Sequence, residues 1–208
     1  MHAPRLGYTS LCHHLDAQQA TSLIMRGLSS AADLVNSFKQ VAVDRATAQR
    51  RIFDLHQTLH EIATTMMRKI RPLGHDIELD IPPEIEMNSY PGPLGQVVAS
   101  MINNALLHAF DGVDHGHMRL SALQLETGRV QIQFRDDGVG IPEQNISRIF
   151  DPFFTTKMGQ GGNGLGLNIC YNIVNTLLNG SITVQSVVGE GTCFTMDLPL
   201  TAPEQVGN

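Results

Sequence analysis

The chain has 208 residues, of which 42% are hydrophobic and 16% charged, as expected of one folded domain with an accessory element. Its formal net charge of -6 argues against an extended nucleic-acid-binding surface. No apolar run approaches the roughly 18 residues that a membrane span requires, and the N-terminus lacks the apolar core of a signal peptide. The cysteines, Cys12, Cys170 and Cys193, show no CxxC spacing, so we expect free thiols and a cytoplasmic protein.

The sequence predicts an irregular segment at 1–17 and, at 18–48, a long helix to about residue 46 followed by a linker. Apolar residues of this helix are spaced alternately by four and three positions: Ile24, Leu28, Ala31, Val35, Phe38 and Ala42. This seven-residue repeat is typical of a coiled coil or a helical bundle. Because one helix cannot bury such a stripe by itself, we expect a partner helix and a homodimer.

Residues 49–201 predict an α/β two-layer sandwich, in which one mixed, mostly antiparallel sheet is covered by helices on one face. Alternating hydrophobicity predicts strands at 50–55, 75–82, 117–125, 129–137, 181–188 and 192–200. Helical periodicity predicts helices at 58–71, 91–110 and 163–178. Residues 202–208 are expected to form a flexible tail.

Two of these elements carry polar residues that suit a nucleotide. One apolar helix contains Asn104, whose amide oxygen suits magnesium, and His108 one turn later. A following strand ends in Asp136, and the next glycines, Gly138 and Gly140, let the backbone approach a flat ligand closely. A carboxylate at this point can accept a hydrogen bond from the amino group of adenine. Taken singly, each of these features fits a structural role more readily than a functional one.

A glycine-rich stretch, with Gly162, Gly164 and Gly166, lies at the start of the next predicted helix. Exposed backbone N–H groups and the dipole of a helix N-terminus together are typical of a phosphate site. The spacing matches neither the Walker A pattern nor the dinucleotide fingerprint, and the later Gly-Glu-Gly turn before Thr192 fits an ordinary hairpin. These weak matches nevertheless follow one another in a fixed order, so we expect them to form one shared site.

In this order the motifs resemble those of the catalytic ATP-binding domain of two-component sensor histidine kinases, in the Bergerat-fold (GHKL) superfamily. The resemblance covers about residues 50–200, and the segment LVNSFKQVAVD at 34–44 resembles the second helix of the dimerisation and phosphotransfer domain. The resemblance implies transfer of the γ-phosphoryl group of Mg-ATP to a histidine, and signalling to a response regulator. It also implies that the parent protein is cytoplasmic or the cytoplasmic part of a membrane-anchored sensor.

The resemblance further implies a role for each matching residue. Asn104 would ligate Mg2+, Asp136 would bind adenine, Lys157 would lie near the phosphates in an ATP lid at 155–163, and Thr192 would close the pocket. Three aromatic residues would anchor the near end of the lid: Phe150, Phe153 and Phe154. Glycines would shape the adenine pocket or receive the phosphates: Gly138, Gly140, Gly162, Gly164 and Gly166. Further residues expected to contact the nucleotide are His108, Ile141, Thr155, Thr156, Leu165 and Leu167.

Two departures from the family pattern affect the functional interpretation. The phosphoacceptor motif of the family is not found, because His13 and His14 lack its context and lie too close to the second helix. We therefore expect phosphorylation of a helical hairpin in trans. Ser100 stands where ATP-hydrolysing relatives place a Glu as general base, which favours a kinase over a hydrolase. Two alternatives stay open: an anti-sigma-type serine kinase of the same fold, and a non-catalytic nucleotide-binding or dimerisation module that regulates partner kinases.

Overall fold

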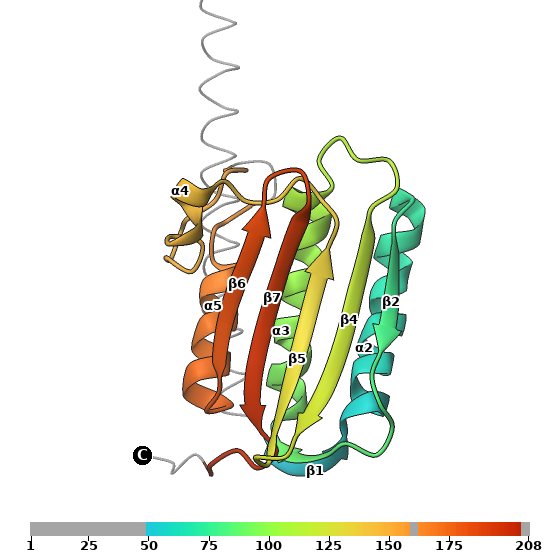
Figure 1. Cartoon of the computed structure of the whole chain (residues 1–208), viewed down its shortest axis with the longest axis vertical. Coiled ribbons are helices and arrows are strands. Elements are labelled where there is room, and N and C mark those ends of the chain that lie inside the picture. Colours follow the sequence, from blue (N-terminus) through green and yellow to red (C-terminus); the bar gives the residue numbers. More distant parts are fainter. Residues whose placement is uncertain (1–48, 159–161, 205–208) are drawn as a thin grey trace, which may run out of the picture. The chain divides into compact units, whose positions relative to one another are not determined.

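The computed structural model describes residues 49–158 and 162–204, so the heptad segment and both candidate acceptor histidines, His13 and His14, lie outside the described residues. The main sheet has five strands, in the spatial order β2-β4-β5-β7-β6 (Figure 1). Their bounds are Asp76–Asp80 (β2), His117–Leu125 (β4), Arg129–Asp136 (β5), Ser181–Val187 (β6) and Gly191–Pro199 (β7). Only the β2–β4 pair is parallel, which confirms the predicted mixed, mostly antiparallel sheet.

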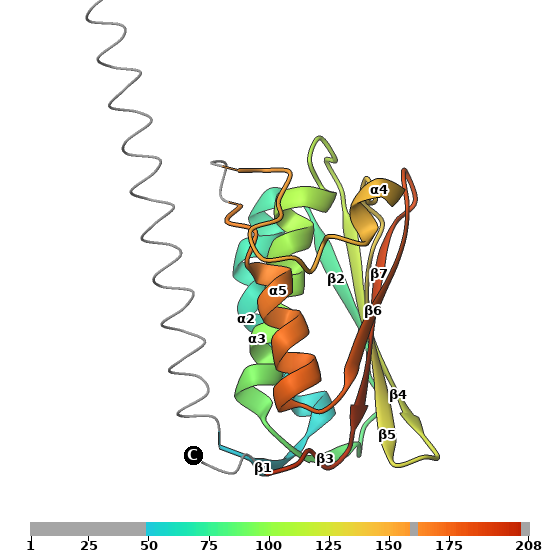
Figure 2. The same cartoon turned by 90° about the vertical axis from the view of Figure 1, so that its left-hand side faces the viewer.

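Three helices cover one face of this sheet, as Figure 2 shows from the side. They are α2 (Leu55–Ile70), α3 (Pro91–Asn104) and α5 (Gly166–Asn172). Both α3 and α5 continue as π-helical turns, over Ala105–Ala109 and Ile173–Leu177. A short 3-10 helix, Arg71–Leu73, follows α2.

Burial alternates along the central strands of the sheet. In β5 and β7 the even-numbered residues, such as Phe134 and Phe194, are buried, whereas the odd-numbered ones, apart from Gly191, face the opposite side and stay at least partly exposed. The buried set packs against apolar residues of the helices, including Leu59 of α2 and Met101 of α3. The core therefore lies between the apolar face of the sheet, where every second strand residue points, and the apolar faces of the helices.

Helix α2 begins before the expected Thr58, because the carboxylate of Asp54 accepts a hydrogen bond from the Gln57 N–H at 2.6 Å and so caps an earlier turn. The expected start of α5 at Asn163 is wrong. The Asn163 Oδ1 atom accepts from the Leu165 N–H at 3.1 Å, and Gly164 has a φ of 68°, so helical hydrogen bonding begins only at Gly166.

Besides the short 3-10 helix, strand β3 and helix α4 were not expected from the sequence. Strand β3 (Glu86–Ser89) pairs antiparallel with β1 (Arg51–Asp54) in a separate two-stranded sheet. Its sequence, EMNS, has a single apolar residue and therefore no alternation to recognise. A single helical turn, α4 (Glu143–Ile146), lies in the connection between β5 and α5.

All the motifs of interest lie at one end of the sheet. The C-terminal end of α3, the loop that follows β5, the start of α5 and the β6–β7 turn meet there (Figure 1). Loops at such an edge are held by the rigid layers beneath them, which suits a binding site. Among the described residues, no helix has the length and apolar character needed to cross a bilayer.

Candidate functional site

A cavity of about 510 Å³ opens between the end of α3, the loop after β5 and the segment at 154–157. A smaller one of about 150 Å³ adjoins it toward the start of α5. Six residues line both: Asn104, His108, Ile149, Phe154, Thr155 and Leu167. The larger volume lies within the range of about 300–1,000 Å³ that is usual for small-molecule sites.

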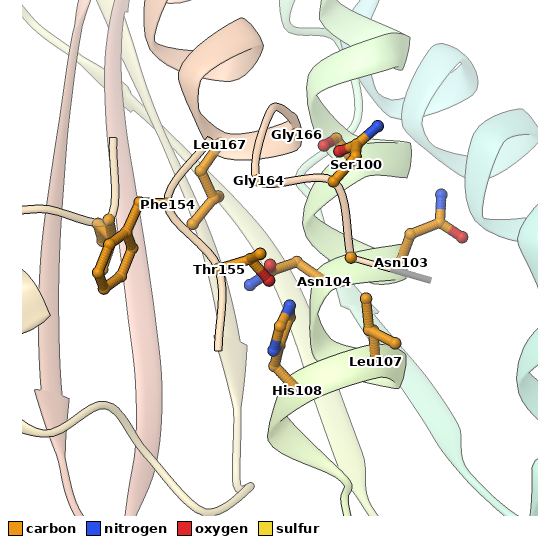
Figure 3. A pocket seen from close by; sticks show the side chains of 13 residues that line it. Ser100, Asn103, Asn104, Leu107, His108, Phe154, Thr155, Gly164, Gly166 and Leu167 are labelled. Carbon is orange, nitrogen blue, oxygen red and sulfur yellow. The ribbon is translucent and has the colours of Figure 1, made fainter. Parts of the chain in front are cut away.

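Helix α3 and its π-helical extension supply some of the polar side chains of the cavity wall, among them Asn104 and His108. Figure 3 shows that the side chains of Asn104, Thr155 and His108 converge, whereas Asn103 points away from them. The Nδ1 atom of His108 lies 3.2 Å from the Thr156 Oγ1 atom, at hydrogen-bond distance. Burial lowers the pKa of His108, and the nearby ammonium group of Lys157 lowers it further. Both effects favour the neutral imidazole of His108.

Asp136 lies at the end of β5, with only 3% of its surface exposed. Its Oδ1 atom accepts a hydrogen bond from the Gly138 N–H at 3.1 Å, and Thr192 lies opposite it across the β5–β7 pair. Burial raises the pKa of Asp136 to about 6, although hydrogen bonds from the Gly138 and Thr192 backbone act in the other direction. Neither Asp136 nor Thr192 lines the two cavities, whereas Gly140 and Ile141 line the larger one.

The loop after β5 packs tightly on the extension of α3. A Cβ atom at Gly138 would lie 2.4 Å from the carbonyl oxygen of Ala109, so only glycine fits there without a shift. The Val139 N–H donates to the same carbonyl oxygen at 2.9 Å. This contact fixes the loop that carries Gly140 and Ile141 against the wall that carries His108.

The three aromatic residues that precede the expected lid differ in their packing and exposure. Phe150 packs on Tyr171, with ring centroids 5.3 Å apart, and Phe154 lines both cavities. The Phe153 side chain is 49% exposed, so any anchoring by this residue comes from its backbone. Its backbone has a φ of 67° and instead packs against Gly164, where a Cβ atom would lie 2.4 Å from the Phe153 carbonyl carbon. Backbone contact thus holds Phe153 and Gly164 together.

Lys157 lies on the wall of the larger cavity, but its ammonium group is already paired. Its Nζ atom lies 2.5 Å from the Oδ2 atom of Asp111, in the loop that follows the extension of α3. The sequence analysis missed Asp111, since an acidic residue after a buried helix carries no motif. It also missed Val139, Asn145 and Val188, which line the same cavity.

The glycine-rich stretch lines the smaller cavity. Gly162, Gly164, Gly166 and Leu167 all contribute to its wall, together with Ser100 of α3. Leu165, which was also expected to contact the nucleotide, is 5% exposed and lines neither cavity. Both cavities therefore combine the motif-bearing segments that the sequence analysis expected to meet.

The oxygen donors of this site fit a magnesium ion that is held mainly by phosphate oxygens and water, with few protein ligands. Asn104 and Asp111 both line the larger cavity. Within 49–158 and 162–204, no group of three or more His, Cys, Asp or Glu side chains is arranged to hold a metal. Mg2+ is commonly bound by one or two protein oxygens together with phosphates and water, which agrees with this sparse set.

Residues 90–202 match a family whose description is histidine kinase-, DNA gyrase B-, and HSP90-like ATPase. The chain belongs to this family. Among curated relatives, the sensor histidine kinase RcsC of Escherichia coli (strain K12) is 31% identical over 189 residues, which cover 87% of this chain and 19% of RcsC. The adaptive-response sensory kinase SasA of Crocosphaera subtropica is 39% identical over 107 residues, covering 50% of this chain and 27% of SasA.

The solved structures agree with this assignment to the ATPase family. The catalytic domain of histidine kinase ThkA superposes with a TM-score of 0.65 at 27% identity, covering 74% of this chain and 97% of that domain. Full-length ShkA in complex with AMPPNP has a TM-score of 0.68 at 24% identity, a likeness of fold that covers 91% of this chain and 40% of ShkA. The chain spans roughly a fifth to a quarter of these two curated relatives, and it carries an ATP-binding domain of the histidine-kinase type.

Proposed function

We propose that this chain binds Mg-ATP and provides the catalytic domain of a two-component protein-histidine kinase. The observation that carries the proposal is the meeting of three motif-bearing segments around one site: the α3 end with Asn104, the glycine loop after β5 and the glycine stretch before α5. The sensor histidine kinases among the relatives support this choice within a family that also includes other ATPases.

The binding roles follow from the chemistry of each group. Asp136, when ionised, accepts a hydrogen bond from the amino group of adenine, and the loop at Gly140 and Ile141 contacts the base. The N–H groups around Gly164 and the helix that starts at Gly166 favour phosphate oxygens. Asn104 is the residue that would hold Mg2+, which would offset the charge of the phosphates. These assignments keep the negative phosphates close to partial positive charge in a protein of net negative charge.

The transfer step requires positioning more than covalent participation by the protein. The attacking group would be an imidazole nitrogen of a helical hairpin in trans, which takes the γ-phosphoryl group while ADP leaves. Ser100 lines the smaller cavity and has no carboxylate with which to activate water, so phosphoryl transfer is favoured over hydrolysis. Hydrogen bonding of Thr156 to neutral His108 would help to order the adjoining segment.

The proposal extends to partners and location. A solved complex of ThkA contains the response regulator protein TrrA, and we infer that a receiver domain is also the downstream partner of this chain's intact kinase. The heptad pattern in 18–48 supports a homodimer. Free cysteines at Cys170 and Cys193 support a reducing, cytoplasmic environment.

A non-catalytic nucleotide-binding module is the second candidate function. It is favoured because the phosphoacceptor motif is not found in this sequence, and such a module would regulate partner kinases by binding or dimerising. Acid-labile phosphate transferred to an added helical hairpin distinguishes a kinase from such a module.

Calorimetric titration with a non-hydrolysable ATP analogue, with and without Mg2+, tests the proposed binding. We expect Mg2+ to strengthen binding, and Asp136→Asn to weaken it at least about tenfold, because an amide cannot replace a purely accepting carboxylate without presenting a donor. The exposed-residue variant Glu143→Gln serves as the control. Unchanged affinity in Asp136→Asn contradicts the adenine role, and no binding to the folded wild-type chain at millimolar analogue contradicts the proposed function as a whole.

A further inference from the structure

The ion pair between Lys157 and Asp111 joins two parts of the site that are far apart in sequence. The Lys157 side chain is only 19% exposed, while the Asp111 side chain is 63% exposed. Both residues line the larger cavity. The amine is therefore held at the cavity wall, with a carboxylate occupying the position that an anionic ligand group would otherwise take.

The Asp111 side of this pair is anchored to the body of the domain. Phe110, its neighbour, is 5% exposed, and its ring lies 4.5 Å from that of His75. The Phe110 N–H donates to the Ala105 carbonyl oxygen at 3.1 Å, and the Val113 N–H donates to the Phe110 carbonyl oxygen at 3.2 Å. The carboxylate thus projects from a turn that is fixed at its root.

The Lys157 side carries a second, weaker link to the same wall. Thr156 lies at hydrogen-bond distance from His108, and Thr155 accepts a hydrogen bond from the Lys157 N–H at 3.1 Å. Neutral His108 gives this link no net charge, so the Lys157–Asp111 pair supplies the electrostatic part of the attachment. An entering polyanion would compete for the ammonium group rather than for the neutral hydrogen bond.

We propose that Asp111 is a positioning residue, which holds Lys157 at the cavity wall and competes with nucleotide phosphates for its ammonium group. The inference rests on the proposed function, because it takes the anionic ligand to be a nucleoside polyphosphate. Coulomb repulsion between the Asp111 carboxylate and the phosphates acts in the same direction as the competition. Asp111 therefore lowers nucleotide affinity, and its effect grows with the number of phosphates.

Calorimetric titration of Asp111→Asn with Mg-ATP, Mg-ADP, AMP and adenosine tests this inference. We expect the variant to bind Mg-ATP about two- to fivefold more tightly than the wild type, the range of a partly exposed ion pair. The gain should fall along the series and disappear for adenosine. It should also shrink as salt rises from about 50 to about 500 mM. A purely structural role of Asp111 would alter binding of all four ligands alike.

Asp114→Asn is the matched control, because it removes the same charge from the same loop, and Asp114 lines neither cavity. Equal affinities of the two variants, or weaker Mg-ATP binding by Asp111→Asn, overturn the inference. In a Lys157→Gln background, Asp111→Asn should lose most of its effect. A full gain in that background would mean that Asp111 acts without Lys157, and it would overturn the positioning role.

Hydrogen exchange without nucleotide separates failure of this inference from failure of the proposed function. Amides at 153–158 should exchange faster in Asp111→Asn than in Asp114→Asn, because the attachment is lost. If exchange differs but no variant binds nucleotide, the proposed function fails and the competition fails with it, although the attachment stands. If the wild type binds Mg-ATP and neither exchange nor affinity distinguishes the variants, the inference alone is wrong.

Discussion

At Asp136 the stability of the fold and the proposed function favour different protonation states of one buried carboxyl group. Its pKa is raised to about 6 by burial, so ionisation near neutral pH costs the folded state free energy. The ionised form is nevertheless the one that only accepts hydrogen bonds, as the proposed contact with adenine requires. A destabilised group of this kind is common where a site needs a particular chemistry.

The raised pKa of Asp136 predicts a pH-dependent gain in stability for Asp136→Asn. Relative to the unfolded chain, the folded state gains from protonation of this carboxyl at low pH, and the gain is lost as pH rises from about 4 through about 6. We expect the variant to be more stable than the wild type at pH 8 by on the order of 1–3 kcal/mol, and the difference to narrow toward pH 4. Urea unfolding at both pH values measures it; a difference that stays constant with pH would contradict the burial argument.

Single residues differ in how far their roles could be expected from the sequence. Asp136 could be proposed as a candidate because a strand pattern ended there and glycines followed at fixed spacing. Asp111 was not, because the pairing of its carboxylate with Lys157 depends on two loops that meet only in the folded chain. The positive φ of Phe153 and the exposure of its side chain were likewise not foreseeable, because no motif in the sequence marks them.

At the scale of elements, the contact between the loop after β5 and the extension of α3 sets the shape of the site. Gly138→Ala would push a methyl group against the Ala109 carbonyl, so one of the two elements must move. We expect a loss of about 1–3 kcal/mol in stability and a clear loss of nucleotide affinity. Gly92→Ala, in the first turn of α3, has open space around its Cβ position and is the matched control. Thermal unfolding and calorimetry measure both effects, and equal behaviour of the two variants would contradict the role of this contact.

The π-helical turns explain a limit of element prediction. Periodicity predicted a continuous helix at 91–110, and the chain does stay helical there, but the hydrogen bonding changes after Asn104. This π-helical turn carries His108, which lines both cavities, and such turns often occur at functional sites. A pattern of apolar residues does not distinguish the two kinds of helix, so the π-helical turn could not be predicted from the sequence.

For the whole domain, stability depends on the layer between sheet and helices. Phe134 is fully buried at the centre of β5, so Phe134→Ala should destabilise the domain by about 3–5 kcal/mol and weaken every function of the site together. Leu123→Ala, at a residue of β4 that is 57% exposed, should change stability by less than about 0.5 kcal/mol. Urea denaturation compares them; similar losses in both variants would mean that the core is not centred between these layers.

The sequence by itself determined the class of the fold, most of its elements and the family, because strand alternation, helical periodicity and turn glycines are local properties of the chain. The motif order, which is itself a sequence property, also predicted which segments would lie together, and three of them line the two cavities. Only the tertiary structure decided the protonation and the side-chain contacts of the residues in that site. The raised pKa of Asp136, the His108–Thr156 contact and the Lys157–Asp111 pair all depend on burial and proximity between distant segments, which arise when the loops converge at one end of the sheet.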